Sequence, residues 1–335
     1  MARIPRSSAL DGLSALVTGG SRGLGLLLSA RLAVRGCRVT VLARDTDELR
    51  RATEWIEERT GTAVSAVACD VRDRAAVGAA VRQTYERTGL DIVIANAGVI
   101  QVAPTEAIEA DAFDDAMATI FGGALNTALA ALPLLRRSPV GGRLGLIGSV
   151  GGLLAVPHLL PYSCAKAALG ALGEGLRAET AAENVSVTTV HPGLMRTGSH
   201  LQAEFGGRSS EEFAWFSALA GAPVVSMNAE RAAERVVRAV ERRRTRLVLT
   251  PAARAASLAH GIAPAAVTRM SGLVNRLLPG AETGHENGAD DIVQGHRIDR
   301  PSSGWTEKLR GWGSALNDRA ARRYNQDRAG PTTTA

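Results

Sequence analysis

Lysine is almost absent from this chain of 335 residues. Lys166 and Lys308 are the only two, and the rest of the 39 basic side chains are arginine. Against 33 acidic residues, this gives a formal net charge of +6. No aromatic-interleaved basic stripe or groove-reading motif accompanies the positive charge, so we expect no nucleic-acid partner.

Cysteine is also scarce. Cys37, Cys69 and Cys164 are an odd number, and none of them has the spacing of a metal site or a CxxC redox motif. We therefore expect no metal and three reduced thiols that fill small spaces in the core of a cytoplasmic protein. The residues before the first apolar strand contain no run of signal-peptide length, which agrees with that location.

Two stretches lack charge altogether, residues 117–135 and 144–165. Each is about as long as a bilayer-spanning helix. The second contains Pro157 and Pro161, and the first contains Asn126, so neither is as apolar as membrane insertion requires. We expect both to be buried elements of the fold.

A regular alternation of short β-branched runs and longer helical patterns occupies the chain up to residue 250. The expected strands are residues 14–18, 38–43, 63–68, 91–95, 142–148, 185–190 and 246–250. The expected helices are residues 22–35, 47–59, 74–88, 111–136, 163–183 and 229–243. This alternation predicts a doubly wound α/β domain of Rossmann type, whose parallel sheet binds ligands at the carboxyl ends of its strands.

The strand signal stops there, which divides the chain into a single α/β domain, 1–251, and a helical, partly loose C-terminal extension, 252–335. Apolar residues at helical spacing between 252 and 280 predict a helix that docks on the domain or lies on an anionic membrane surface. Docking is favoured because Pro264 interrupts the stripe. Residues 281–303 are expected to be loose and 305–325 helical. A chain cut after Ala252 is expected to keep cofactor binding.

A glycine-rich loop lies between the first expected strand and helix, which is where a βαβ unit binds a diphosphate. Glycine lets the backbone turn tightly and approach the diphosphate, while the free N–H groups at the helix N-terminus stabilise its charge. The residues of this loop are Gly19, Ser21, Arg22, Gly23, Leu24 and Gly25.

The Gly-x-x-x-Gly-x-Gly spacing resembles that of the short-chain dehydrogenase/reductase family, and five further motifs follow in that family's order. They are Asp70-Val71, Asn96-Ala97-Gly98, Ser149, Tyr162-x-x-x-Lys166 and Pro192-Gly193-x-x-x-Thr197. The resemblance covers residues 10–251. It implies a nicotinamide-dependent enzyme that interconverts alcohols and carbonyls. It also implies that the glycine-rich loop, Asp70-Val71, Asn96-Ala97-Gly98, Tyr162, Lys166 and Pro192-Gly193-x-x-x-Thr197 contact the cofactor.

Reduction of a carbonyl needs a hydride on carbon and a proton on oxygen. A tyrosine hydroxyl is normally a weak acid, with a pKa of about 10. Lys166 lies one helical turn from Tyr162, where its ammonium can favour the phenolate, and Ser149 can hold the substrate oxygen. A helix-surface pair is the alternative, but a lone lysine at this position of an arginine-rich chain favours the catalytic interpretation.

Cofactor preference depends on the residues after the second expected strand. Arg44 fits the 2′-phosphate of NADP(H), with help from Arg22, whereas an acidic residue there would accept from the ribose hydroxyl of NAD(H). Asp45 becomes that acidic residue if the strand is one position longer. We expect NADP(H), with NAD(H) as the alternative.

Thr119 departs from the pattern that the resemblance implies. The family places an asparagine in an Asn-x-x-Gly context here, where it supports a water of the proton relay to the active-site lysine. This chain has Thr119 followed by Gly122, and Asn126 lies too far along the helix to replace it. Thr119 is therefore a candidate relay residue, and its hydroxyl can still carry a water.

Substrate class and assembly are predicted from apolar surfaces. Residues 197–224 are expected to cover the site. Their aromatics are Phe205, Phe213, Trp215 and Phe216, which with Leu194 and Met195 suggest a bulky apolar alcohol or carbonyl, although the aromatics can equally pack on one another. His158 is a candidate substrate contact.

The uncharged run 117–135 resembles the family's subunit-contact helix, which implies a homodimer or homotetramer. The alternative function is a non-catalytic dinucleotide-binding or interaction protein.

Overall fold

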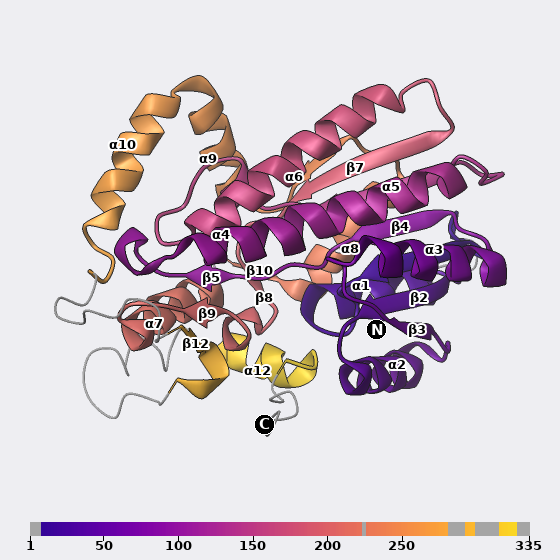
Figure 1. The fold of residues 1–335 in the computed structure, drawn as a ribbon, viewed down its shortest axis with the longest axis horizontal. Helices are drawn as coiled ribbons and strands as arrows, with labels where there is room; N and C mark the ends of the chain where they lie inside the picture. The colour runs from indigo at the N-terminus through magenta and orange to yellow at the C-terminus, as the bar shows by residue number, and fades with distance from the viewer. Residues whose placement is uncertain (1–7, 223–225, 281–291, 299–314, 327–335) are drawn as a thin grey trace.

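A computed structural model describes residues 8–222, 226–280, 292–298 and 315–326 (Figure 1). Its central sheet has seven strands in the order β11-β7-β6-β4-β1-β2-β3, all parallel. The strands are β1 (Ser14–Thr18), β2 (Arg38–Ala43), β3 (Ser65–Ala68), β4 (Ile92–Ala95), β6 (Gly142–Ile147), β7 (Val185–His191) and β11 (Arg246–Val248). The predicted doubly wound α/β fold is confirmed.

Helices cover both faces of this sheet, so its central strands are apolar on both sides. One face carries α1 (Gly23–Val34), α2 (Thr46–Thr60) and α8 (Ala229–Glu241). The other carries α3 (Arg74–Thr88), α4 (Ala110–Ala116), α5 (Gly123–Leu135) and α6 (Leu160–Glu179).

The long central helix expected at 111–136 is interrupted by a π-helix at Met117–Gly122, which joins α4 to α5. Together these elements form one helix, Ala110–Leu135, that is long and apolar enough to span a bilayer. However, 56% of its most apolar window is buried within the protein. The helix packs on α3 and α6 as part of the core.

Short elements surround the carboxyl ends of the strands. The strands are β5 (Gln101–Val102), β8 (Met195–Arg196), β9 (Glu204–Phe205), β10 (Met227–Asn228) and β12 (Val293–Gln294). The helices are α7 (Ser209–Gly221) and the 3₁₀ turns Thr105–Ala107, Val150–Gly152, Ser199–Leu201 and Gly295–Arg297. Strands β12, β9 and β5 pair in that order, so a segment expected to be loose adds a strand beside the site.

The first part of the extension forms a hairpin of α9 (Pro251–Ile262) and α10 (Pro264–Asn275), with Pro264 at the start of the second helix. The hairpin projects from the α/β domain (Figure 1, orange). Ile262 and Leu277 are 84% and 85% exposed, and no described side chain of α10 is buried. Docking of the apolar stripe on the domain is therefore wrong, while contact with a membrane surface stays a prediction.

The last described element, α12 (Ala315–Arg323), lies within the helix predicted at 305–325. The rest of that prediction, residues 305–314, and the last nine residues lie outside the described part of the chain. Helix α12 returns to the domain and contacts α7 and β8. The extension thus leaves the domain along the α9–α10 hairpin and comes back to it with α12. The boundary between 251 and 252 stays a prediction.

Candidate active site

A cavity of about 450 Å³ opens at the carboxyl ends of the sheet strands. Of the residues predicted for catalysis and cofactor binding, all but Gly23 line it. They are Gly19, Ser21, Arg22, Leu24, Gly25, Arg44, Asp70, Val71, Asn96, Ala97, Gly98, Thr119, Ser149, Tyr162, Lys166, Pro192, Gly193 and Thr197. The fold brings these residues together from loops far apart in the chain, and their individual roles stay predictions.

The glycine-rich loop is packed so closely that side chains cannot replace two of its glycines. Gly19 has φ +61°, and a Cβ atom on it would lie 2.8 Å from the Cα of Ala97. A Cβ on Gly25 would lie 2.0 Å from the carbonyl oxygen of Gly19. The loop consequently brings the N-terminus of α1 to the cavity, where its first N–H groups have no acceptor within the helix.

Lys166 projects from the second turn of α6 into the cavity wall and is 4% exposed. Its Nζ donates a hydrogen bond to the carbonyl oxygen of Ile147 at 2.6 Å. Burial lowers the pKa of the Lys166 ammonium to about 8. The ammonium thus lies at the cavity wall with little solvent around it.

Tyr162 lies in the first turn of the same helix, with Lys166 Nζ 5.6 Å from the centroid of its ring. Burial raises the pKa of the Tyr162 phenol, and a hydrogen bond with Ser149 opposes that rise. Ser149 follows β6 by two residues and caps the 3₁₀ turn Val150–Gly152, where its Oγ accepts a hydrogen bond from the N–H of Gly151 at 3.0 Å. Serine, tyrosine and lysine thus meet at one point of the cavity.

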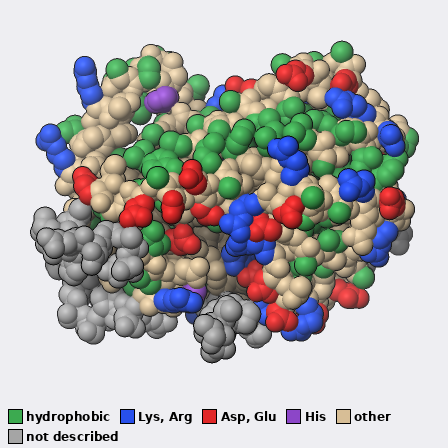
Figure 2. All heavy atoms as spheres, viewed as in Figure 1, with side chains coloured by type: hydrophobic (Ala, Val, Ile, Leu, Met, Phe, Trp, Pro, Cys, Tyr) green, Lys and Arg blue, Asp and Glu red, His purple; other side chains and the backbone are tan. Residues whose placement is uncertain are grey.

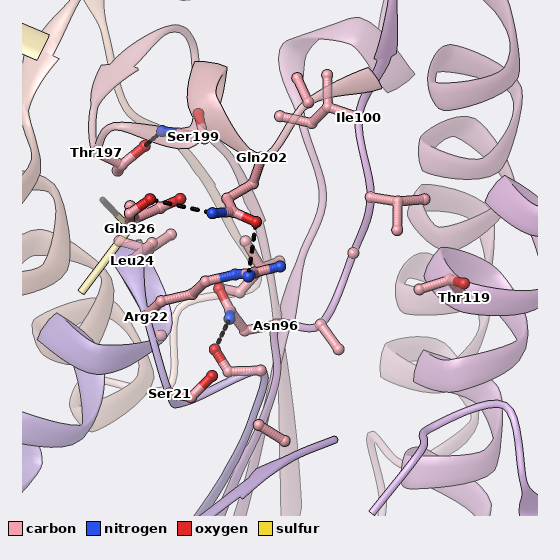
Figure 3. Close-up of a pocket in the computed structure, with 18 of the residues that line it drawn as sticks. Ser21, Arg22, Leu24, Asn96, Ile100, Thr119, Thr197, Ser199, Gln202 and Gln326 are labelled. Atoms are coloured by element: carbon pink, nitrogen blue, oxygen red, sulfur yellow. Dashed lines mark hydrogen bonds between the residues drawn. The ribbon is translucent and has the colours of Figure 1, made fainter. Parts of the chain in front are cut away.

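Thr119 lies on the π-helix, is 8% exposed and reaches the cavity from the side opposite Thr197 (Figure 3). Its hydroxyl donates to Asp115 Oδ1 at 3.5 Å, which is a long hydrogen bond. Asn126 is occupied elsewhere, because its amide donates to the carbonyl oxygen of Val71 at 3.0 Å and accepts from Arg74. Its side chain is thus held at the start of α3, as expected for a residue that does not replace the missing asparagine.

Arg44 and Asp45 have different tasks at the end of β2. Asp45 caps α2, since its carboxylate accepts a hydrogen bond from the N–H of Glu48 at 2.8 Å. Arg44 is exposed, lines the cavity and forms no ion pair with any described residue. Arg22 is already paired, with Glu48 at 2.8 Å and with Gln202 at 3.0 Å. Of the two arginines considered for the cofactor, Arg44 is thus the one without an ion pair among the described residues.

Sequence reasoning missed several polar residues of the wall. Glu48, Gln202, Gln294, His296 and Gln326 line the cavity. Glu48 stands three residues after an N-cap aspartate, a spacing that signals only helix capping. The last three belong to the extension, so the extension supplies part of the cavity wall, which the sequence did not predict.

The aromatics of residues 197–224 form a cluster of their own. Phe205, Phe213 and Phe216 are buried and meet in edge contacts, with ring centroids 5.4 to 5.9 Å apart. None of them lines the cavity, whereas Met195 does. Of the two interpretations of these aromatics, packing on one another is the one observed.

Two further expectations are corrected. His158 is buried outside the cavity and hydrogen-bonds Glu212, itself buried, at 2.8 Å, so it holds the loop before α6 to α7. Cys164 is exposed rather than a core residue, because it lies on the outer side of α6, while Cys37 and Cys69 are buried as expected. Burial raises the pKa of the Cys37 thiol to about 12.

Comparison with known proteins places this geometry in context. The family described as short chain dehydrogenase matches residues 14–204. A dehydrogenase/reductase SDR family protein 7-like of Anopheles gambiae is 30% identical over 261 residues, which is 76% of this chain and 80% of the relative. A tropinone reductase homolog of Arabidopsis thaliana is 35% identical over 196 residues, 58% of this chain and 71% of the relative.

Solved structures share the fold. L-sorbose reductase from Gluconobacter frateurii, complexed with NADPH and L-sorbose, has a TM-score of 0.63 at 23% identity, over 72% of this chain and 95% of that one. A short chain dehydrogenase from Mycobacterium paratuberculosis, bound to NAD, has a TM-score of 0.62 at 23% identity, over 72% of this chain and 97% of that one.

Proposed function

Because the chain belongs to the short-chain dehydrogenase family and is an NAD(P)-dependent dehydrogenase/reductase, we propose that it interconverts an alcohol and a carbonyl with Tyr162 as general acid/base. The meeting of Ser149, Tyr162 and Lys166 in one cavity carries this proposal. The dinucleotide fits the same cavity, whose wall runs from Arg44 past the start of α1 to Ser149. When bound, it supplies or accepts the hydride.

In carbonyl reduction, the Ser149 hydroxyl donates a hydrogen bond to the substrate oxygen and holds it beside Tyr162. The Tyr162 hydroxyl donates its proton to that oxygen as the carbon becomes an alcohol carbon. The buried ammonium of Lys166 stabilises the resulting phenolate. In alcohol oxidation each step runs backwards, and the phenolate accepts the alcohol proton. Thr119 is proposed to hold a water that returns the proton from solvent.

Turnover by purified protein separates this function from a non-catalytic one. A panel of cyclic and open-chain apolar ketones with NADPH should show consumption of the cofactor, read at 340 nm. Met195 and Ile100 supply apolar wall to the cavity and support an apolar substrate. Binding of NADPH without turnover of any ketone, or of the matching alcohols with NADP⁺, would favour the dinucleotide-binding alternative.

NADP(H) is proposed as the preferred cofactor, because Arg44 is a free cation while Asp45 is engaged in capping. Arg44→Ala should weaken NADPH binding about 10- to 150-fold, as expected for the loss of a charge-assisted hydrogen bond of roughly 1.5–3 kcal/mol. The Kd for NADH should change little. Isothermal titration of both cofactors measures this.

Arg50→Ala is the matched control, since Arg50 is exposed on α2 and pairs with Glu54 away from the cavity. It should leave both affinities unchanged. Tighter binding of NADH than of NADPH by the wild type would instead assign the ribose contact to Asp45.

Homo-oligomer formation is proposed through α5. Phe121 on the preceding π-helix and Leu125, Leu129 and Pro133 on α5 recur every four residues, and Leu129 is 52% exposed. Figure 2 shows a band of apolar side chains over this face and α6. Such a continuous patch is typical of a subunit interface. We expect a homodimer or homotetramer.

Leu129→Glu should shift the protein toward monomer, because the charge would be buried against a second copy. Light scattering at micromolar concentration measures the mass. Val140→Glu, at an exposed apolar residue beyond α5, should leave it unchanged. A wild-type monomer would contradict assembly.

A further inference from the structure

The described end of the extension lies directly on the glycine-rich loop. The N–H of Gly23 donates to the carbonyl oxygen of Tyr324 at 3.0 Å. The amide of Asn325 donates to the carbonyl oxygen of Ser21 at 3.0 Å. Two backbone groups of the loop are thus satisfied by residues from the opposite end of the chain, which fixes this end of the extension at the start of α1.

Buried side chains anchor α12 in this place. Asn317 is fully buried, accepts from the N–H of Gly198 at 2.9 Å and hydrogen-bonds the buried His200 at 2.8 Å. Tyr324 is 3% exposed, and its ring meets that of Trp55 edge-on, with the ring centroids 6.5 Å apart. A buried polar network of this kind specifies one position for the segment.

Gln326 is the residue that this anchoring delivers to the cavity. It is 5% exposed and lines the cavity, and its backbone oxygen accepts from Gln202 Nε2 at 3.0 Å. Its Oε1 is buried without a hydrogen-bond partner among the described residues. A Cβ atom on Gly23 would lie 2.4 Å from its Nε2, so the amide packs directly against this glycine. Figure 3 shows Gln326 beside Leu24 and Thr197.

A buried amide oxygen without a donor is costly, and such groups in native proteins mark a missing partner. The N-terminus of a helix is a diphosphate site, and a ribose hydroxyl next to the diphosphate is a donor. The amide of Gln326 carries both an acceptor and donors at this position. It therefore matches the junction of diphosphate and ribose in a dinucleotide.

We propose that Gln326 is a cofactor-binding residue contributed by the C-terminal extension, whose amide donates to the nicotinamide-side phosphate and accepts from the hydroxyl of the adjoining nicotinamide ribose. The inference depends on the proposed function, because it requires a dinucleotide in the cavity. Gln326 lies outside the part of the chain that matches the family, which ends at residue 204. The extension thereby becomes part of the cofactor site.

Titration of the full-length protein with NADPH tests the proposal. Gln326→Ala should raise the Kd for NADPH about 10-fold, the size expected for hydrogen bonds to a charged group. Adenosine 2′,5′-bisphosphate lacks the nicotinamide half of the cofactor, so its Kd should be unchanged. Gln83→Ala, at an exposed glutamine of α3, is the matched control and should alter neither Kd.

The outcomes distinguish failure of the proposed function from failure of the proposed role of Gln326. Failure of the wild type to bind NADPH or NADH contradicts the proposed function itself. Binding by the wild type with an equal Kd in Gln326→Ala overturns only the role of Gln326. Tighter NADPH binding by the variant would show that Gln326 obstructs the site, and equal weakening of both ligands would show a structural role. Both of these results overturn the proposal.

Discussion

Replacing Tyr162 with phenylalanine should lower kcat by two orders of magnitude or more, while the Kd for the cofactor stays near that of the wild type. The change removes only the hydroxyl that exchanges a proton with the substrate oxygen, and general acid–base catalysis contributes about 10²- to 10⁴-fold. The ring that forms part of the cavity wall remains. Steady-state kinetics with the best ketone and titration with NADPH measure the two quantities.

The pH dependence gives this prediction a second readout. Burial raises the pKa of the Tyr162 phenol, so the cofactor-free enzyme holds it protonated at neutral pH, ready to act as an acid. Carbonyl reduction should therefore slow as pH rises, because first the Lys166 ammonium, with its pKa of about 8, and then the Tyr162 phenol lose their protons. Tyr85→Phe, in a half-buried tyrosine of α3, should leave this rate unchanged. Full turnover by Tyr162→Phe would exclude the mechanism.

Lys166→Met should abolish turnover and at the same time make the cofactor-free protein more stable at pH 7. Lowering the lysine pKa from 10.5 to about 8 means that burial disfavours the charged form. At 1.36 kcal/mol per pKa unit this cost is about 3 kcal/mol. Loss of the hydrogen bond to Ile147 offsets part of it, so the free energy of unfolding should rise by about 1–2 kcal/mol. Urea denaturation measures it.

The sign of the pH effect follows from proton binding. Between about pH 8 and 10.5 the unfolded wild type holds more protons on Lys166 than the folded protein does, so its stability rises with pH in this window. The advantage of Lys166→Met should be complete below pH 8 and should shrink toward pH 10.5. A stability advantage that is independent of pH, or a destabilised variant, would show that burial in the folded protein does not disfavour the charged form of Lys166.

The sheet and the motif residues could be predicted because their signals are local. β-Branched runs mark β1, β2, β4 and β7, and strand–helix alternation leaves little choice of topology. Parallel order then brings the residues after each strand to one edge. Asn96 and Ser149 could thus be placed in one cavity from sequence alone, and the structure has them there.

Contacts between distant segments left no such signal. Asn317 and His200 are 117 positions apart, and neither lies in a recognisable pattern. Strands β9 and β12 have two residues each, too few for periodicity, and exist because they pair with one another. The sequence could not show whether the aromatics of residues 197–224 contact substrate or pack on one another. Docking of the α9–α10 hairpin was predicted wrongly, because an apolar stripe at helical spacing does not indicate which surface, if any, covers it.

The return of the chain end to the glycine-rich loop also orders events during synthesis. Asn325 follows its partner Ser21 by 304 positions. At roughly 5–20 residues per second, about 15–60 s separate the two on the ribosome. Strands and helices of the sheet can assemble during that interval, but the loop must wait for its last hydrogen-bond partners. A nascent chain would therefore acquire its sheet well before it completes the wall around Gln326.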